Sequence, residues 1–123
     1  MSERPLVCMV DDDESVRESL PDLLREFGFE VRPFSYAGAF LASDCLALCD
    51  CLILDIAMPE MTGPDLQREL KRRGRDIPIV FITAQIDEKV RRRVLEQGAV
   101  ACLCKPFSQA DLLAALRAAF LGQ

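Results

Sequence analysis

The sequence contains no histidine. Without an imidazole, the chain cannot form a Ser-His-Asp or Cys-His catalytic arrangement, or a histidine-ligated metal site. If a phosphohistidine takes part in the function, it must therefore lie on another molecule. Repeats, low-complexity tracts and linkers are also missing from the 123 residues, so we expect a single domain over residues 1–123.

Long hydrophobic runs are absent as well. Hydrophobic residues make up 50% of the chain, yet no run approaches the roughly 20 residues of a membrane span. Residues 1–5 lack the basic region and the cleavage site of a signal peptide. We therefore expect a soluble, cytoplasmic domain that does not bind membranes. The net charge of -5 argues against direct binding to the phosphate backbone of nucleic acids, which calls for a basic face.

Cysteine is present six times, but never in the C-x2-C spacing of structural zinc sites. Free cysteine is a common small hydrophobic residue inside strands, and cytosolic proteins rarely hold disulfides. We therefore expect reduced thiols. The six positions are Cys8, Cys45, Cys49, Cys51, Cys102 and Cys104. The C-x3-C-x-C segment over residues 45–51 is the part that best supports the alternative, a thiol-based redox or metal sensor.

Apolar runs of strand length alternate with segments of helical period, which indicates βαβ units and a parallel sheet. Pro33 cannot donate to a ladder, so the second strand should lie at an edge of the sheet. The predicted strands cover residues 6–10, 30–34, 51–54, 77–82 and 99–104. The predicted helices cover residues 15–27, a short segment with Phe40 and Leu41, and residues 64–73, 87–97 and 112–120.

Three features of the predicted helices are unusual. Pro21 stands inside the first helix, where we expect a kink or a break. The helix over residues 87–97 has few apolar residues and should be weakly held. The last helix, over residues 112–120, is apolar on nearly every face and should need a second burial surface.

Polar residues directly follow four of the predicted strands. They are Asp11 and Asp12, then Asp55, then Thr83, and finally Lys105. Right-handed crossovers place the carboxyl ends of parallel strands at one edge of the sheet, where the ligands of such sheets bind. These side chains should therefore converge.

The predicted group of side chains suits phosphoryl transfer to a carboxylate. Two or three carboxylates form a hard oxygen site suited to Mg²⁺ with several waters retained. Asp55 would be the nucleophile, and Lys105 together with the metal would neutralise charge on the phosphoryl oxygens. Thr83 would position those oxygens.

Four short motifs surround these polar residues: Val10-Asp11-Asp12, Leu54-Asp55-Ile56-Ala57-Met58-Pro59 with Thr62-Gly63, Ile82-Thr83-Ala84 and Lys105-Pro106-Phe107. In this combination they resemble the motifs of the receiver (CheY-like) domains of two-component response regulators. The resemblance covers essentially the whole chain and implies a flavodoxin-like, doubly wound, five-stranded parallel sheet of order 2-1-3-4-5 with five flanking helices. The spacing Met58-Pro59-x-Met61-x-Gly63 is similar to that of FixJ/NarL-like regulators, whose members often carry a C-terminal DNA-binding domain.

The resemblance implies that Asp55 accepts a phosphoryl group from the histidine of a sensor histidine kinase, with Mg²⁺ required. It implies that the side chains of Asp12 and Asp55 and the carbonyl of Ala57 ligate the metal, and that Asp11 does so mainly through water. It also implies a cis peptide bond before Pro106. Such a domain is not an enzyme beyond its own phosphorylation and slow dephosphorylation.

One position departs from the family pattern. Three residues before the lysine, receiver domains usually have Tyr or Phe, which turns inward as Thr83 follows the phosphoryl group; here the residue is Cys102. The resemblance implies homodimerisation through the fourth helix (residues 87–97), the fifth strand and the last helix. DNA would be bound only through an output domain that is not in this chain.

A rival hypothesis from the enzyme class is a Mg²⁺-dependent phosphohydrolase with an aspartyl-phosphate intermediate, of the haloacid-dehalogenase type. Those enzymes resemble this site but use a second Asp, two residues after the nucleophile, as acid and base. That position is Ala57 here, which argues against turnover.

Overall fold

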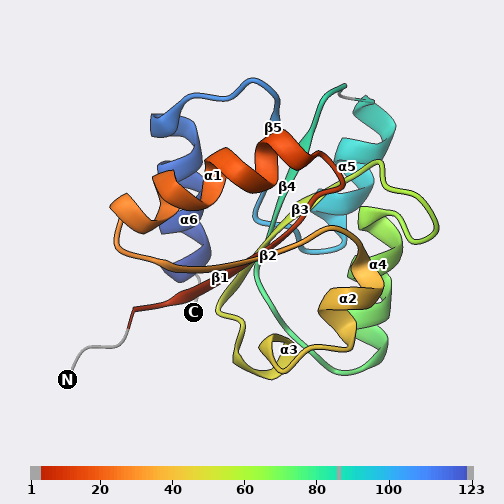
Figure 1. Ribbon diagram of the computed structural model, residues 1–123. Coiled ribbons are helices and arrows are strands. Elements are labelled where there is room, and N and C mark those ends of the chain that lie inside the picture. Colours follow the sequence, from red (N-terminus) through yellow and green to blue (C-terminus); the bar gives the residue numbers. More distant parts are fainter. Residues whose placement is uncertain (1–3, 86, 122–123) are drawn as a thin grey trace.

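The fold is a parallel sheet of five strands with helices on both of its faces (Figure 1). The computed structural model describes residues 4–85 and 87–121. The strand order β2-β1-β3-β4-β5 confirms the predicted doubly wound topology. The strands are β1 (Leu6–Val10), β2 (Glu30–Phe34), β3 (Cys51–Asp55), β4 (Ile79–Thr83) and β5 (Ala101–Cys104). The helices are α1 (Glu14–Glu26), α2 (Ala37–Leu41), α3 (Cys45–Leu48), α4 (Gly63–Arg72), α5 (Glu88–Glu96) and α6 (Gln109–Leu121).

The described part of the chain thus has six helices instead of the five expected. The additional one is α3, a helix of four residues between α2 and β3. The helices predicted over residues 64–73, 87–97 and 112–120 correspond to α4, α5 and α6. The face that the resemblance assigns to dimerisation is therefore formed here by α5, β5 and α6.

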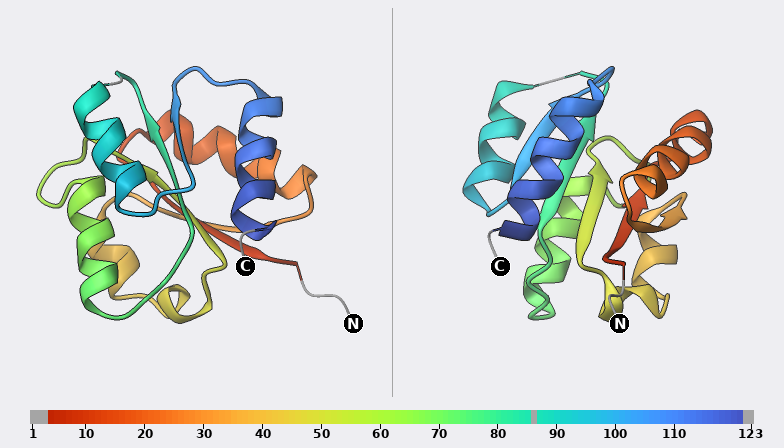
Figure 2. Two further views of the ribbon diagram at one scale, coloured as in Figure 1. Left: turned by 180° about the vertical axis from the view of Figure 1, so that it is seen from behind. Right: turned by 90° about the vertical axis from the view of Figure 1, so that its left-hand side faces the viewer.

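The sheet separates two hydrophobic clusters. Figure 2 shows α1 and α6 on one side of the sheet, and α2, α4 and α5 on the other. Because side chains alternate along a strand, Val7 and Met9 pack towards α1 and α6, whereas Cys8 and Val10 pack towards α2 and α4. Strands β1, β3 and β4 are buried along their whole length, as expected for the central strands of a parallel sheet.

Of the kink or break predicted at Pro21, the break does not occur. Helix α1 runs without interruption from Glu14 to Glu26, with Pro21 inside it. A proline at this place removes a single intrahelical hydrogen bond, the one that residue 21 would donate to the carbonyl of Arg17. The proline ring is buried against the sheet together with Leu20 and Leu24, and this packing holds the helix in one piece.

Strands β4 and β5 each begin two residues later than predicted. Pro78 has no N–H to give to a ladder, and β4 starts at the next residue, Ile79. The N–H of Ala99 is not free for β5, because it donates to the carbonyl of Val94 at 3.0 Å and so completes the end of α5.

Helices α5 and α6 differ in the way they are anchored. In α5 only Val94 is buried, which agrees with the prediction of a weakly held helix. Helix α6 buries Leu112 and Leu116 against the sheet but leaves Leu121, at its end, 86% exposed. Within residues 4–85 and 87–121, no helix has the length and apolar character needed to cross a membrane.

Candidate functional site

The side chains predicted to converge do meet at the carboxyl edge of the sheet. Asp11 directly follows β1, Asp55 and Thr83 are the last residues of β3 and β4, and Lys105 directly follows β5. Carboxylate oxygens of Asp11, Asp12 and Asp55 lie within 4.8 Å of one another. Asp11 is fully buried and Asp55 is 6% exposed, whereas Asp12 reaches the surface.

Lys105, the residue after β5, lies beside this acidic cluster. Its Nζ donates to Oδ2 of Asp11 at 2.9 Å and lies 4.0 Å from Oδ2 of Asp55. Burial alone would lower the pKa of the ammonium group, but the hydrogen bond with Asp11 and the nearby carboxylates outweigh it, and the pKa of Lys105 is raised. The site therefore favours the charged form of the lysine.

The charge on Asp55 is only partly balanced. Burial and the neighbouring charge of Asp11 raise its pKa from 3.8 to about 7, although Lys105 acts in the opposite direction. Three carboxylates share a single ammonium group, so the cluster favours an additional cation. Because all the ligands are oxygens, a hard divalent ion such as Mg²⁺ fits this donor set.

Three hydrogen bonds that the sequence did not predict hold the loop after β1. The guanidinium of Arg17, on the first turns of α1, donates to the carbonyl of Asp11 at 2.9 Å. The N–H of Asp11 donates to the carbonyl of Phe34 at 3.1 Å, and its Oδ1 accepts from the N–H of Asp13 at 2.9 Å. Nothing in the spacing of Arg17 marks such a contact, because a long side chain six residues away has many other possible partners.

The loop after β3 fits tightly against the strand that carries Asp55. Gly63, the first residue of α4, donates its N–H to the carbonyl of Ile56 at 2.9 Å. A Cβ atom at this position would lie 2.3 Å from the carbonyl oxygen of Asp55 and 2.9 Å from the ring of Phe81. Thr62 then closes the start of α4 in a capping box with Asp65. Only a glycine allows the helix to begin this close to the end of β3.

A hollow of about 420 Å³ opens directly over these groups. Thr83 lies at its wall, where its hydroxyl donates to the carbonyl of Gln85 at 2.7 Å and accepts from the Gln85 N–H at 3.3 Å. The predicted residues Asp55, Thr83 and Lys105 thus share one cavity, and Gln85 is a member that the sequence did not point to. The lining residues are Asp12, Asp13, Asp55, Ile56, Ala57, Thr83, Ala84, Gln85 and Lys105.

Cys102, at the position where receiver domains usually have an aromatic residue, lies in β5 and is not among the residues that line this hollow. It is opposite Phe81 in the register of β4 and β5, and its thiol is buried in the cluster that includes Val94 of α5. Burial raises the pKa of this thiol. The peptide bond between Lys105 and Pro106 is cis, as the resemblance implied.

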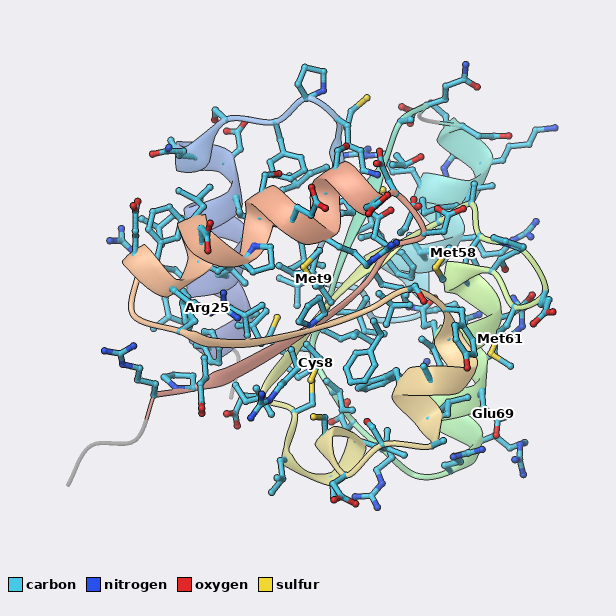
Figure 3. All side chains as sticks on the ribbon, viewed as in Figure 1. Cys8, Met9, Arg25, Met58, Met61 and Glu69 are labelled. Atoms are coloured by element: carbon cyan, nitrogen blue, oxygen red, sulfur yellow. The ribbon has the colours of Figure 1, made fainter. Side chains whose placement is uncertain are left out.

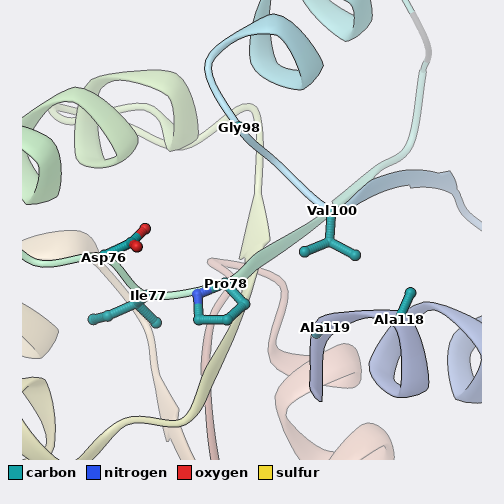
Figure 4. Close-up of a pocket in the computed structure, with 7 residues that line it drawn as sticks. All are labelled: Asp76, Ile77, Pro78, Gly98, Val100, Ala118 and Ala119. Carbon is teal, nitrogen blue, oxygen red and sulfur yellow. The ribbon is translucent and has the colours of Figure 1, made fainter. Parts of the chain in front are cut away.

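A second hollow, of about 280 Å³, lies away from the acidic cluster (Figure 4). It is formed by the segment before β4, the segment before β5 and the end of α6. Asp76 is its single titratable lining residue, so it lacks the groups needed for phosphoryl transfer. Its lining residues are Asp76, Ile77, Pro78, Gly98, Val100, Ala118 and Ala119.

A 2-1-3-4-5 sheet with three carboxylates and a lysine at its carboxyl edge defines the class of CheY-like α/β domains. Residues 7–117 match the family described as the response regulator receiver domain. The chain belongs to this family and is the receiver domain of a two-component response regulator.

Relatives of known name agree with this assignment. The chain is 44% identical over 120 residues to the response regulator protein TodT of Pseudomonas putida, covering 97% of this chain and 53% of the relative. It is 36% identical to the transcriptional regulatory protein FixJ of Azorhizobium caulinodans, covering 96% of this chain and 56% of FixJ. The structure of response regulator StyR superposes with a TM-score of 0.85 at 45% identity, covering 94% of this chain and 58% of StyR. The chain thus spans about half the length of these relatives.

Proposed function

We propose that this domain accepts a phosphoryl group on the carboxylate of Asp55 from a phosphohistidine of a sensor histidine kinase, in a Mg²⁺-dependent reaction. The observation that carries the proposal is the buried Asp55 carboxylate, which faces an open hollow beside two further carboxylates and Lys105. Because these 123 residues contain no histidine, a phosphohistidine donor must lie outside them.

In the proposed reaction, an oxygen of Asp55 attacks phosphorus while the bond between phosphorus and the donor nitrogen breaks. Asp12 and Asp55 would hold the Mg²⁺ ion with the carbonyl of Ala57, and Asp11 would act mainly through water. When bound, the ion supplies positive charge that neutralises the phosphoryl oxygens. Lys105 lies 4.0 Å from Asp55 Oδ2, close enough for its ammonium group to donate to a phosphoryl oxygen once that group is in place.

Thr83 would transmit phosphorylation of Asp55 to the loop before α5 by changing its hydrogen-bond partner. Its hydroxyl now donates to the Gln85 carbonyl, a neutral acceptor, and an anionic phosphoryl oxygen is a stronger one. Turning the hydroxyl towards Asp55 would release the loop before α5, the helix with a single buried residue. In place of an inward-turning aromatic ring this chain has Cys102, which is already buried beneath α5, so we assign the movement to the loop and α5.

The proposed output is homodimerisation through α5, β5 and α6. Small or apolar side chains such as Ala114, Ala118 and Leu121 remain exposed on α6, which suits a surface that a second copy covers. FixJ is a transcriptional regulatory protein and is longer than this chain. We therefore propose that any DNA binding resides in an output domain outside this chain, and that the response controls transcription.

The direct test is to incubate the purified chain with acetyl phosphate and Mg²⁺ and to measure the intact mass. We expect the mass to increase by one phosphoryl group, and the label to be removed by hydroxylamine, which cleaves acyl phosphates. A label that survives hydroxylamine would be a phosphoester on another residue and would contradict the proposal. Continuous release of phosphate over many turnovers would instead favour a phosphohydrolase, which Ala57 argues against, because no acid or base stands at that position.

Lys105→Ala should separate phosphorylation from output. We expect the variant to accept phosphate more slowly, because Asp55 and the metal ligands remain, and to show no phosphate-dependent increase in dimer. Lys71→Ala removes an exposed lysine of α4 as a matched control and should behave like the wild type. Sedimentation velocity with and without acetyl phosphate measures the dimer. Normal dimerisation of the Lys105 variant would rule out the proposed role of the ammonium group in signalling.

Binding of Mg²⁺ should weaken as the pH falls below about 7, because protons compete for Asp55, whose pKa is raised to about 7. Asp55 binds this proton more tightly in the folded protein than in the unfolded chain. Without metal, the contribution of Asp55 to the free energy of unfolding therefore increases as the pH falls from about 7 towards 3.8. We expect the apparent Mg²⁺ affinity to drop up to about tenfold per pH unit in this window. Thermal unfolding with and without Mg²⁺ at constant ionic strength measures the effect, and a Mg²⁺ shift independent of pH would contradict it.

A further inference from the structure

Three cysteines from two segments that are far apart in the sequence meet on the face of the sheet covered by α2 and α3. Cys8 lies in the middle of β1, Cys45 is the first residue of α3, and Cys49 is the residue that ends α3. Figure 3 shows the side chain of Cys8 pointing from β1 towards α3. The sulfurs come together because of the short helix α3, which the sequence pattern did not predict.

The thiols of these residues share one environment. Cys8 is fully buried in the hydrophobic cluster of this face, and Cys45 and Cys49 pack against that cluster while half-exposed. The thiols of Cys49 and Cys45 are close enough to the Cys8 thiol for hydrogen bonding with it to raise its pKa. The thiol of Cys49 also lies 3.1 Å from the carbonyl oxygen of Cys51.

The three cysteines of the C-x3-C-x-C segment do not lie on one face of the sheet. The side chain of Cys51 belongs to the hydrophobic cluster on the opposite face of the sheet, with Val7 and Ile53. Cys8 takes its place beside Cys45 and Cys49. All six cysteines, each of which lies in the described part of the chain, are free thiols.

The two interacting thiols of Cys8 and Cys49 are not equivalent. Hydrogen bonding from Cys8 lowers the pKa of Cys49, although burial opposes this. The same hydrogen bond, together with burial, raises the pKa of Cys8. A half-exposed thiol with a lowered pKa beside a buried thiol with a raised pKa is the arrangement of an attacking and a resolving cysteine.

We propose that Cys49 and Cys8 form a redox-active dithiol that peroxides oxidise to an intramolecular disulfide between β1 and the end of α3. The Cys49 thiolate attacks one oxygen of hydrogen peroxide, the O–O bond breaks, and Cys49 becomes a sulfenic acid as hydroxide leaves. The sulfur of Cys8 then attacks the sulfur of Cys49, the S–O bond breaks, and water leaves. In sum, two thiols and one peroxide give one disulfide and two waters.

The dithiol lies apart from the phosphorylation site, so the proposal stands independently of the phosphoryl chemistry. Cys104 is the exposed cysteine of the chain and lies next to Lys105, where it would react with oxidants without a buried partner. Any experiment on the dithiol must therefore remove Cys104 first. Cys45 and Cys49 both belong to the α3 segment, so Cys45→Ser and Cys49→Ser form a matched pair of variants.

The test uses the reduced, metal-free chain carrying Cys104→Ser, treated with hydrogen peroxide and analysed by non-reducing peptide mapping. We expect the intact mass to fall by two hydrogens and a crosslink to join Cys8 to the segment over residues 45–51. Cys49→Ser should slow this crosslink by at least about tenfold, because the attacking thiolate is lost. Cys45→Ser and Cys51→Ala should retain the crosslink, and circular dichroism of each reduced variant verifies that it is folded.

Three results would overturn the proposal. The first is a wild-type rate of crosslinking in folded Cys49→Ser. The second is the absence of a crosslink at peroxide concentrations that fully oxidise Cys104 in the unmodified chain. The third is zinc or copper that the reduced protein retains in stoichiometric amount after gel filtration and that Cys49→Ser loses, because the thiols would then be metal ligands.

Discussion

Asp55→Asn should abolish labelling by acetyl phosphate in the presence of Mg²⁺. The amide has no anionic oxygen to attack phosphorus and offers the metal a weaker ligand, while its size and shape are almost unchanged. The remaining carboxylates, Asp11 and Asp12, should not substitute. Asp11 is fully buried and bound to Lys105 at 2.9 Å, and Asp12 lies outside the strand that presents the acceptor. Intact-mass measurement should therefore show no phosphoryl group.

The same variant should be at least as stable as the wild type in Mg²⁺-free buffer at pH 8. Burial and Asp11 raise the pKa of Asp55 to about 7, which means that the folded state disfavours the charged carboxylate. Replacing it with a neutral amide relieves this cost. Urea unfolding of both proteins measures the difference, and it separates loss of the acceptor from loss of the fold.

Asp50→Asn is the matched control for this experiment. Asp50 lies at the opposite end of β3, where its Oδ2 accepts from the N–H of Leu6 at 2.8 Å, and an asparagine oxygen can keep this bond. This variant should be labelled like the wild type. Full labelling of Asp55→Asn would place the acceptor elsewhere, whereas loss of labelling in both variants would point to a general effect of changing the charge of β3.

Much of the fold and of the candidate site could be predicted because their signals are strong and local. Apolar runs separated by helical segments indicate a parallel sheet, and the rules of strand crossover then bring Asp11, Asp55, Thr83 and Lys105 to one edge. No distance information is needed for that step. The chemistry at this edge follows from the residue types alone, since clustered carboxylates with a lysine favour a hard cation and an anionic substrate.

What could not be predicted depends on contacts that leave no pattern in the sequence. Helix α3 has four residues, too few to show a helical period. Without α3, nothing indicates that Cys8 lies beside Cys45 and Cys49. The contact of Arg17 with the Asp11 carbonyl is of the same kind, because a flexible side chain reaches a backbone atom. The unbroken α1 at Pro21 shows tertiary packing overriding a local preference.

Gly63→Ala should disturb both stability and phosphorylation, although alanine is the better residue inside a helix. Alanine gains up to about 1 kcal/mol over glycine from helix propensity. Its Cβ, however, would lie 2.3 Å from the backbone oxygen of Asp55 and 2.9 Å from the buried ring of Phe81. Neither group can move freely, since the oxygen belongs to a central strand and the ring is fully buried. Overpacking of this kind costs about 1–3 kcal/mol or more, so the steric effect should prevail.

We expect Gly63→Ala to unfold at lower urea, by about 2 kcal/mol in free energy, and to be labelled more slowly by acetyl phosphate, because the strand end that carries Asp55 must shift. Gly38→Ala is the control, since it is the same change in helix α2. There the added Cβ meets only the side chain of Tyr36, at 3.1 Å, and that side chain is 51% exposed and free to turn away. This control should keep its labelling rate and its stability. If both variants behaved alike, the close approach of α4 to the acceptor strand would not be what makes a glycine necessary at position 63.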